Sequence, residues 1–385
     1  MMMWGKIGRM KILAIESTCD ETAAAVVESF GDGVRVLKSV VASSVEMHEK
    51  YGGIVPEVAA REQIKSIIPV ITEAMSDEEV DAVAVSYGPG LMGSLLVGVE
   101  TAKVLAWAWK KPLLKVNHMA AHVMANWILA ESDTVSQWHT DTVPELPAVG
   151  LVVSGGHTDL ILMESLTKWT WIGGTRDDAV GEAFDKAARI LGLLYPGGPE
   201  IEKAASKVTE KEWKTNKNKF KLPRPLIHDP GLEMSFSGIK AAIARVVESK
   251  EYKDWISPFG DQRPYQVGND KTNGVRFLDC ARNDELKRNL VAREFSEAVI
   301  EVLVKKTMMA IEQYRLKSVV LAGGVAANNK LRETLKHEVE RAGLSFHVPE
   351  LKYCGDNAAM VGAVAILRRE EAELDLKPEP SLATV

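Results

Sequence analysis

Cysteine is scarce in this sequence, and a long apolar run is absent. The three cysteines, Cys19, Cys280 and Cys354, are odd in number and widely spaced, so we expect neither a disulfide framework nor a zinc ribbon. The first ten residues contain no apolar core of a signal peptide, and no uncharged apolar stretch is long enough to span a bilayer. These absences predict a cytoplasmic protein that has no membrane partner.

A strong charge of one sign is also missing. The chain has 47 basic and 53 acidic residues, which give a net charge of -6. Such a balance provides no positive field that holds a nucleic acid unaided. A nucleic-acid ligand would therefore need a local basic patch or a partner protein. The length of 385 residues exceeds one ordinary domain and suits two.

Strand-like and helix-like stretches follow one another in both halves of the chain. In the first half we expect strands at 11–18, 22–27, 34–41, 82–86 and 113–117, and helices at 56–75, 91–109 and 118–129. In the second half we expect strands at 148–154, 159–164, 168–172 and 318–321, and helices at 178–191, 199–207, 237–248 and 285–314, with two more helices after them. Three strands that open each half are typical of a duplicated actin-like core.

This order predicts an α/β fold of two actin-like (ASKHA, ribonuclease H-like) lobes, with mixed sheets and a nucleotide and metal cleft between the lobes. The first lobe is expected at 10–130, joined by the C-terminal helix at about 356–370. The second lobe is expected at 147–350. It carries an inserted surface loop at about 250–282, where the chain is polar and unpatterned.

A pair of histidines is the first feature that points to chemistry. In His118-Met-Ala-Ala-His122, the spacing of four places both imidazoles on one helix face, where they can bind one metal ion. The alternative is two unrelated polar residues at a helix start. The pair directly follows a strand end, where open α/β sheets place their ligands. Met119 stands where a zinc protease has its glutamate base, so the pattern predicts a metal that positions substrate and not a peptidase.

A third metal ligand has to come from another part of the chain. Asp356, in Cys354-Gly-Asp-Asn357, opens the last helix and is one candidate. The alternative is that Asp356 only caps this helix, which is the more common role of aspartate at such a position.

Three glycine clusters form the second feature: Val153-Ser-Gly-Gly-His-Thr158, Tyr195-Pro-Gly-Gly-Pro199 and Leu321-Ala-Gly-Gly-Val-Ala-Ala-Asn328. Glycine turns let the backbone approach a phosphate, and their amides point at anions. One such turn is ordinary architecture, but three in one chain favour a nucleotide bound between two lobes. Asp185 suits ribose hydroxyls as an acceptor, and a solvated helix face is the equal alternative.

Together with further motifs, these residues resemble the TsaD family of tRNA threonylcarbamoyladenosine transferases, in its bacterial form. The motifs occur in the family's order from Lys11 to about Leu367. They are Glu16-Ser-Thr-Cys-Asp-Glu-Thr22, Tyr51-Gly-Gly-Ile-Val-Pro-Glu57, Gly88-Pro-Gly-Leu-Met-Gly93, Asn117-His-Met-Ala-Ala-His122, Ser154-Gly-Gly-His-Thr158, Gly181-Glu-Ala-Phe-Asp-Lys186, Tyr195-Pro-Gly-Gly-Pro199, Ser235-Phe-Ser-Gly-Ile-Lys240, Ala322-Gly-Gly-Val-Ala-Ala-Asn328 and Asp356-Asn-Ala-Ala-Met360.

The resemblance implies a divalent metal, iron (Fe2+) in the family, held by His118, His122 and Asp356; this donor set also suits zinc or manganese. Val153 replaces a tyrosine of archaeal relatives and cannot ligate a metal, so no fourth protein ligand is expected. The implied adenylate-binding residues are Val153, Ser154, Gly155, Gly156, His157, Asp185, Gly198, Glu202 and Asn328, of which Glu202 matches a nucleotide-contacting glutamate of the archaeal relatives.

The implied reaction transfers the threonylcarbamoyl group from threonylcarbamoyl-adenylate to the exocyclic amine of the adenosine 3′ of the anticodon, in tRNAs that read codons starting with A, and releases AMP. No side chain is expected to form a covalent intermediate. The implied partners are a TsaB-like paralogue at residues 56–75, a TsaE-like ATPase, and a TsaC-like enzyme that makes the adenylate. The alternatives are a small-molecule kinase of the actin-like superfamily, which gives no reason for the histidine pair, and a non-catalytic scaffold, whose relatives lack it.

Overall fold

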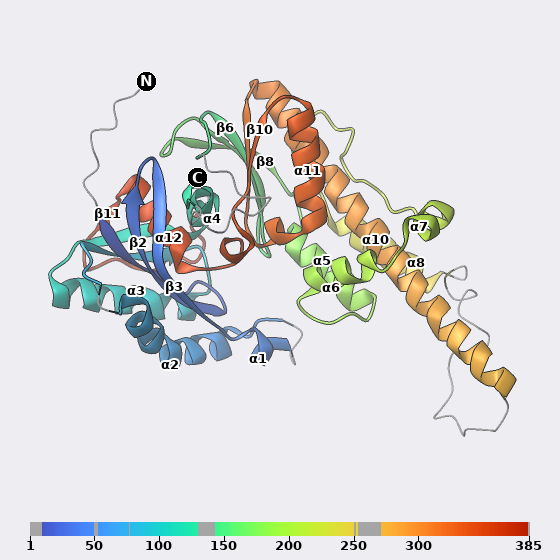
Figure 1. The fold of residues 1–385 in the computed structure, drawn as a ribbon, viewed down its shortest axis with the longest axis horizontal. Coiled ribbons are helices and arrows are strands. Elements are labelled where there is room, and N and C mark those ends of the chain that lie inside the picture. The colour runs from blue at the N-terminus through green and yellow to red at the C-terminus, as the bar shows by residue number, and fades with distance from the viewer. Residues whose placement is uncertain are drawn as a thin grey trace. The chain divides into compact units, whose positions relative to one another are not determined.

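The computed structural model describes residues 10–49, 53–76, 78–129, 143–249, 252 and 271–383, with only the backbone described for 49 and 271–284 (Figure 1). The chain divides into two compact units, Met1–Gly174 with Thr307–Val385, and Thr175–Lys306. The first unit contains both sheets, and the second is mostly helical. The lobes predicted at 10–130 and 147–350 each surround one of the two sheets, and this division differs from the two compact units. The predicted lobe boundaries stay a prediction.

The first sheet has six strands in the order β11-β5-β4-β1-β2-β3. Strands β1, β2 and β3 are antiparallel neighbours, whereas β1, β4 and β5 run parallel. The strands are β1 (Lys11–Glu16), β2 (Glu21–Phe30), β3 (Gly33–Ser43), β4 (Ala82–Gly88), β5 (Leu113–Asn117) and β11 (Glu371–Ala372).

The second sheet repeats this arrangement. Its order is β10-β9-β6-β7-β8, again with three antiparallel strands, β6 to β8, and with β6, β9 and β10 parallel. The strands are β6 (Ala148–Val153), β7 (Thr158–Met163), β8 (Trp169–Gly174), β9 (Ser318–Ala322) and β10 (Ser345–His347). The repeat confirms the predicted fold class of two actin-like mixed sheets, whereas the cleft between lobes stays a prediction.

Helices cover both faces of the first sheet. Alternate side chains of β1 point to opposite faces, so that Leu13 and Ile15 pack with α2 and α3, whereas Ile12 and Ala14 pack with α4 and α12. A strand buried on both faces forms a nearly continuous apolar run, as β1 does between Lys11 and Glu16. The helices of the first unit are α1 (Val45–Glu49), α2 (Pro56–Met75), α3 (Met92–Trp109), α4 (His118–Met124), η1 (Ala125–Trp127), η2 (Gly324–Ala327), α11 (Asn329–Arg341), η3 (Leu351–Tyr353) and α12 (Ala358–Arg368).

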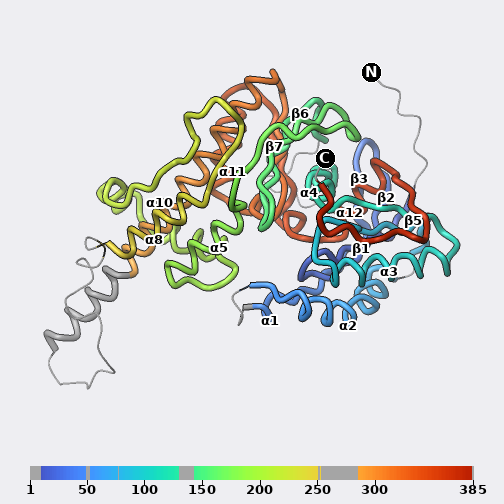
Figure 2. The backbone as a smooth tube through the Cα atoms, turned by 180° about the vertical axis from the view of Figure 1, so that it is seen from behind, coloured from blue at the N-terminus to red at the C-terminus, as the bar shows by residue number. Residues whose placement is uncertain are grey.

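Helix α4 is central to the first unit. All seven of its residues are buried, and it belongs to a hydrophobic cluster that includes side chains of β1, β6, β9 and α12. Apart from His118 and His122, all residues of α4 are apolar, and a helix that is apolar on nearly all sides has to be buried in this way. The C-terminal segment also returns to this unit (Figure 2), where the Glu379 amide donates to Tyr87 O (2.7 Å) and Asn117 Nδ2 donates to Ala383 O (2.7 Å).

The second unit contains α5 (Val180–Ile190), α6 (Gly197–Ser206), α7 (Glu210–Asn216), α8 (Ser237–Glu248) and most of α10 (Lys271–Tyr314). Residues 271–282 begin α10, so that part of the predicted loop at 250–282 is wrong. The rest of that loop lies outside the described residues, except residue 252. Within the described part of the chain, no helix is both long and apolar enough to cross a membrane.

Candidate functional site

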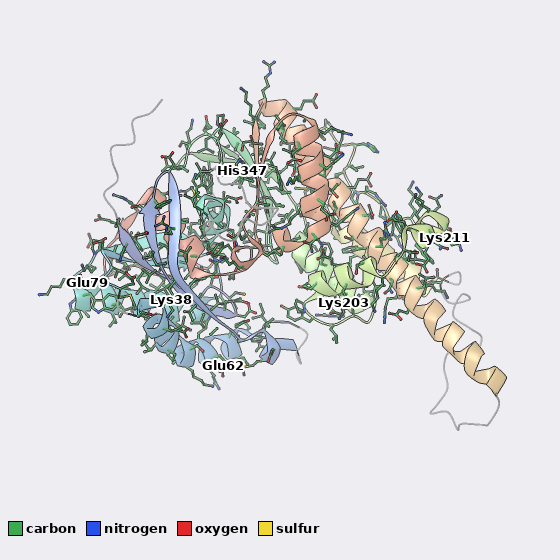
Figure 3. All side chains as sticks on the ribbon, viewed as in Figure 1. Lys38, Glu62, Glu79, Lys203, Lys211 and His347 are labelled. Atoms are coloured by element: carbon green, nitrogen blue, oxygen red, sulfur yellow. The ribbon has the colours of Figure 1, made fainter. Side chains whose placement is uncertain are left out.

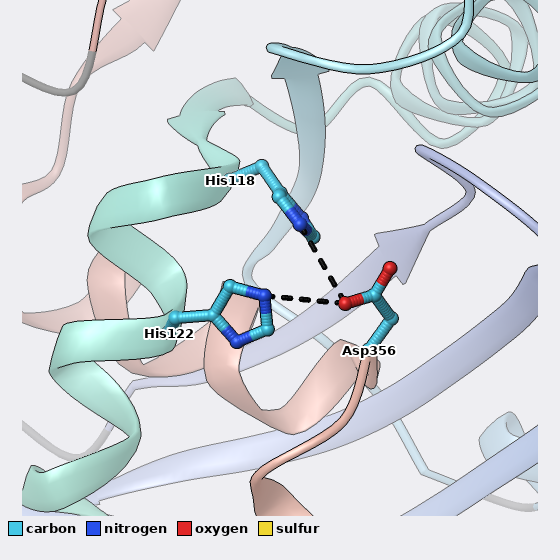
Figure 4. Close-up of side chains that lie close together, drawn as sticks. All are labelled: His118, His122 and Asp356. Carbon is cyan, nitrogen blue, oxygen red and sulfur yellow. Dashed lines mark ion pairs between the residues drawn. The ribbon is translucent and has the colours of Figure 1, made fainter. Parts of the chain in front are cut away.

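His118 and His122 are placed by the junction of β5 and α4. The side chain of Asn117 caps the helix, because its Oδ1 accepts hydrogen bonds from the amides of Met119 (2.8 Å) and Ala120 (3.1 Å). His118 is thus the first helical residue, and His122 follows one turn later on the same face. The two rings meet edge to face with centroids 4.6 Å apart, as Figure 4 shows.

Asp356 reaches this pair from the turn before α12 (Figure 4). Its Oδ1 lies 3.2 Å from His122 Nε2 and 3.6 Å from His118 Nε2. The alternative role of Asp356 as a helix cap is wrong, because Asn357 caps α12 through a bond from the Met360 amide to Asn357 Oδ1 (3.0 Å). The neighbouring asparagine thus leaves the aspartate carboxylate facing the imidazoles.

The cluster of His118, His122 and Asp356 fits one divalent metal ion. Its ligand atoms all lie within 4.8 Å of one another. Ligands bound about 2.1 Å from one ion lie roughly 3.0–3.4 Å apart, close to the two distances from the Asp356 carboxylate. Two imidazole nitrogens and one carboxylate oxygen are a donor set for iron, zinc or manganese.

The charges within the cluster compensate one another. Burial alone would lower the pKa of His118, but the carboxylates of Glu16 and Asp356 raise it to about 9. Burial would likewise raise the pKa of Asp356, yet His118 and His122 lower it to about 2. These groups therefore form buried ion pairs.

Two glycine turns of the first unit lie next to each other. The turn 153–157 closes the β6–β7 hairpin, with the Ser154 amide donating to His157 O (2.9 Å). Gly323 has φ +91°, and a Cβ on it would lie 2.4 Å from Val153 O, so only glycine fits here. Burial lowers the pKa of His157, Asp159 opposes this shift, and the charges of His118 and His122 lower the pKa further.

The other residues expected at the nucleotide are divided between the units. Asn328 caps α11, accepting from the Leu331 amide (2.9 Å), in the first unit. In the second unit, Asp185 Oδ1 accepts from the Gly197 amide (2.7 Å), beside Gly198 at the start of α6. Glu202 lies farther along α6 and is half-buried. The structure thus groups Asp185 with the Gly197–Gly198 turn, while the nucleotide roles of all these residues stay predictions.

Comparison with known proteins decides the family. The family model TsaD, described as tRNA N6-adenosine threonylcarbamoyltransferase, matches residues 35–363. The chain belongs to the TsaD family. Proteins named tRNA N6-adenosine threonylcarbamoyltransferase include one of Moorella thermoacetica, 44% identical over 96% of each chain, and one of Dehalococcoides mccartyi, 42% identical over 97% of this chain and 99% of the relative. One of Enterococcus faecalis is 38% identical over 97% and 96%. As a TsaD protein, the chain is a transferase enzyme of tRNA modification.

Sequence reasoning missed a buried carboxylate behind the TsaD metal-type cluster. Glu16 is fully buried, and its Oε2 lies 3.1 Å from His118 Nδ1 and 2.6 Å from the Ser86 hydroxyl, which donates to it. A proton on Nδ1 that is donated to Glu16 leaves Nε2 as the metal-facing atom. Glu16, Ser86 and His118 stand at or near the carboxyl ends of three neighbouring parallel strands, where open α/β sheets place their ligands. The position of Glu16 at the end of a strand-like run is the feature of the sequence that could have identified it.

Replacing Glu16 by glutamine is expected to weaken metal binding by about 10–100-fold, the usual effect of losing such a supporting carboxylate. The change keeps the size of the side chain but removes the negative charge that holds the His118 ring. Titration with Fe2+ or Mn2+ of the folded variant measures the dissociation constant.

Glu28→Gln is the matched control, because Glu28 is also a buried glutamate of the first sheet but pairs with Arg35. The same metal affinity in the Glu16 and Glu28 variants, both with intact circular dichroism, would contradict the positioning role of Glu16.

Proposed function

We propose that this chain transfers the threonylcarbamoyl group from threonylcarbamoyl-adenylate to the exocyclic amine of the adenosine 3′ of the anticodon, in tRNAs that read codons starting with A. The reaction takes place in the cytoplasm and releases AMP. The observation that supports this most is the convergence of His118, His122 and Asp356 in a chain that belongs to the TsaD family.

The bonds exchanged are those of an acyl transfer. The amine nitrogen of the adenosine attacks the carbamoyl carbon, a nitrogen–carbon bond forms, and the bond from that carbon to the phosphate oxygen breaks. AMP leaves with the bonding electron pair, and one amine proton passes to solvent. The mixed anhydride already carries the activation energy, so the protein mainly has to orient the amine and stabilise charge on the carbamoyl oxygen.

The chain's own residues can supply this orientation. Gly155 and Gly156 are exposed, and nothing lies within 4 Å of the position of a Cβ on either, so a phosphate can approach their backbone. Asp185 is an acceptor for ribose hydroxyls, and Asn328 and Glu202 are the remaining nucleotide contacts that we propose. No side chain forms a covalent bond with the substrate.

Iron(II) is the metal that we propose for His118, His122 and Asp356, with zinc and manganese as alternatives for the same donors. When bound, such an ion acts as a Lewis acid toward the carbamoyl oxygen and helps to place the substrate. The glutamate base of a zinc peptidase is missing from α4, because Met119 stands at its position and is buried in the hydrophobic core.

The test is an assay of the full chain with tRNA, threonylcarbamoyl-adenylate labelled in threonine, and the TsaB-like and TsaE-like partners. We expect label in tRNAs that read codons starting with A, with one AMP released per threonine transferred, and no label in tRNAs that read other codons. Absence of label with every combination of partners, together with ATP-dependent phosphorylation of a small metabolite, would reject the transferase in favour of a kinase.

A TsaB-like paralogue is the partner that we propose for α2, with a TsaE-like ATPase and an upstream TsaC-like enzyme completing the system. Ile64 and Ile68 are 64% and 57% exposed and lie one turn apart on the same face of α2. Two large apolar side chains exposed side by side are typical of a contact surface.

Changing both Ile64 and Ile68 to glutamate is expected to abolish complex formation with the paralogue, because two charges would be buried in the contact. Calorimetry or co-purification measures this. Leu194→Glu with Leu374→Glu is the control, since both leucines are also exposed. Unchanged binding by the Ile64 and Ile68 variant would exclude this face of α2.

A further inference from the structure

Residues 203–221, the lysine segment, concentrate positive charge in an otherwise acidic chain. The segment contains seven lysines and two glutamates, a net charge of +5, whereas the whole chain carries -6, so that all other residues together carry -11. All seven lysines are exposed. They are Lys203, Lys207, Lys211, Lys214, Lys217, Lys219 and Lys221; Figure 3 marks Lys203 on α6 and Lys211 on α7.

The two glutamates of the segment have structural partners outside the run of lysines. Glu212 closes a capping box at the start of α7, where it bonds to the Thr209 amide (2.9 Å) and hydroxyl (2.6 Å). Glu210 pairs with Arg293 of α10. Both carboxylates therefore serve to hold α7 in place.

Four of the seven lysines have no acidic partner among the residues that the structure describes. Lys203 pairs with Glu200 (3.4 Å) and Lys207 with Glu285 (2.7 Å). Among the described residues, no ion pair involves Lys211, Lys214, Lys217 or Lys221; these four are named the open lysines. They lie along α7 and the loop after it.

The backbone beneath the open lysines is well supported. Arg293 lies over the Trp213 ring at 4.8 Å and donates to Val208 O (3.0 Å). Phe220 is buried against Tyr252, with ring centroids 6.0 Å apart. Buried anchors thus alternate with exposed lysines, so the positive charges occupy a defined surface of the second unit.

We propose that the lysine segment binds the phosphate backbone of tRNA; this rests on the proposed function, which requires a tRNA substrate. Clustered lysines on a fixed surface are the electrostatic footprint of a nucleic-acid contact. Binding there releases condensed counterions from the RNA, which provides affinity without reading sequence. The chain's net charge of -6 would otherwise repel the polyanion. If the lysine segment only kept the chain in solution, lysine would not be preferred over aspartate or glutamate, since acidic residues serve solubility at least as well.

The test compares tRNA binding by the full chain and by a variant in which the four open lysines are glutamine. Fluorescence anisotropy of labelled tRNA over a range of KCl concentrations gives the dissociation constant and its salt dependence. We expect the slope of log K against log salt to fall by about 0.7–0.9 for each lysine that contacts a phosphate, thus by about three if all four do. Affinity at low salt should fall at least about tenfold.

The matched control changes four lysines of other surfaces, Lys110, Lys111, Lys168 and Lys317, to glutamine. All four are exposed, so the control alters the net charge equally, and we expect it to keep nearly the wild-type slope. Equal slopes and affinities for the two variants would overturn the proposal, and that result would assign the lysine segment to another partner, such as an acidic protein. A wild-type chain that binds tRNA through this segment but transfers no threonylcarbamoyl group would reject the proposed function alone.

Discussion

Replacing His118 and His122 together by alanine is expected to abolish high-affinity binding of one divalent metal ion and to lower threonylcarbamoyl transfer at least about 100-fold, since even supporting groups of a metal site cost 10–100-fold. The change removes two of the three side chains whose ligand atoms lie within 4.8 Å of one another. Metal content after incubation with Fe2+, and labelled threonine in tRNA, are the two measurements.

Asp356→Asn supplies a second variant for the same question, because it removes the charged ligand without changing the volume of the side chain. We expect it to lose metal and activity as well. His228→Ala with His337→Ala is the control, because it removes the same number of histidines, neither of which belongs to the cluster; metal binding and transfer should both be unaffected. A double variant of His118 and His122 that is folded, free of metal and fully active would show that the cluster is not needed for transfer.

Replacing Arg332 by methionine is expected to lower the free energy of unfolding by about 3 kcal/mol. Arg332 is fully buried in α11, where its guanidinium donates to the carbonyl oxygens of Ala326 and Pro349 (2.9 Å for Pro349) and to Cys354 Sγ (2.7 Å). Methionine would leave two buried carbonyls unsatisfied, at about 1–3 kcal/mol each. The loss is partly offset because an arginine without a described acidic partner is itself costly to bury.

The same change should also weaken metal binding, because Arg332 connects the turn at Ala326 to the segment that leads from Pro349 to Asp356. Urea unfolding measures the stability, and metal titration of the folded variant measures the second effect. Arg341→Met is the matched control, since Arg341 lies on the same helix with a side chain 70% exposed. If the two variants were equally stable, Arg332 would not hold these segments together.

Local patterns were sufficient for most of the first unit. Apolar runs bounded by turn residues predicted β5, and apolar spacing with an early proline predicted α2; both have the predicted bounds. The spacing of His118 and His122 placed them on one helix face. Short elements such as α7 were missed, because one or two helical turns carry too little periodicity to stand out. The start of α10 was also missed, because residues 271–282 are polar and show no helical pattern of apolar residues.

The choice between two roles of Asp356 needed the tertiary structure. Aspartate and asparagine are both good helix caps, so the sequence Asp356-Asn357 does not say which of them caps α12. The fold places the Asp356 carboxylate 3.2 Å from His122 Nε2, and the cap is left to Asn357. In the same way, Glu16 and His118 are 102 residues apart and meet only because β1, β4 and β5 run parallel.

By itself, the sequence determined the fold class, the family and the histidine pair, because strand order, helix spacing and the TsaD motifs are local properties of the chain. The tertiary structure decided which groups support those residues, that Arg332 connects the glycine turn to the segment before Asp356, and that four lysines of the lysine segment have no described acidic partner. Each of these depends on distances between residues far apart in the chain. A net charge or a local pattern contains no information about such distances, since they arise only when the sheets and helices pack.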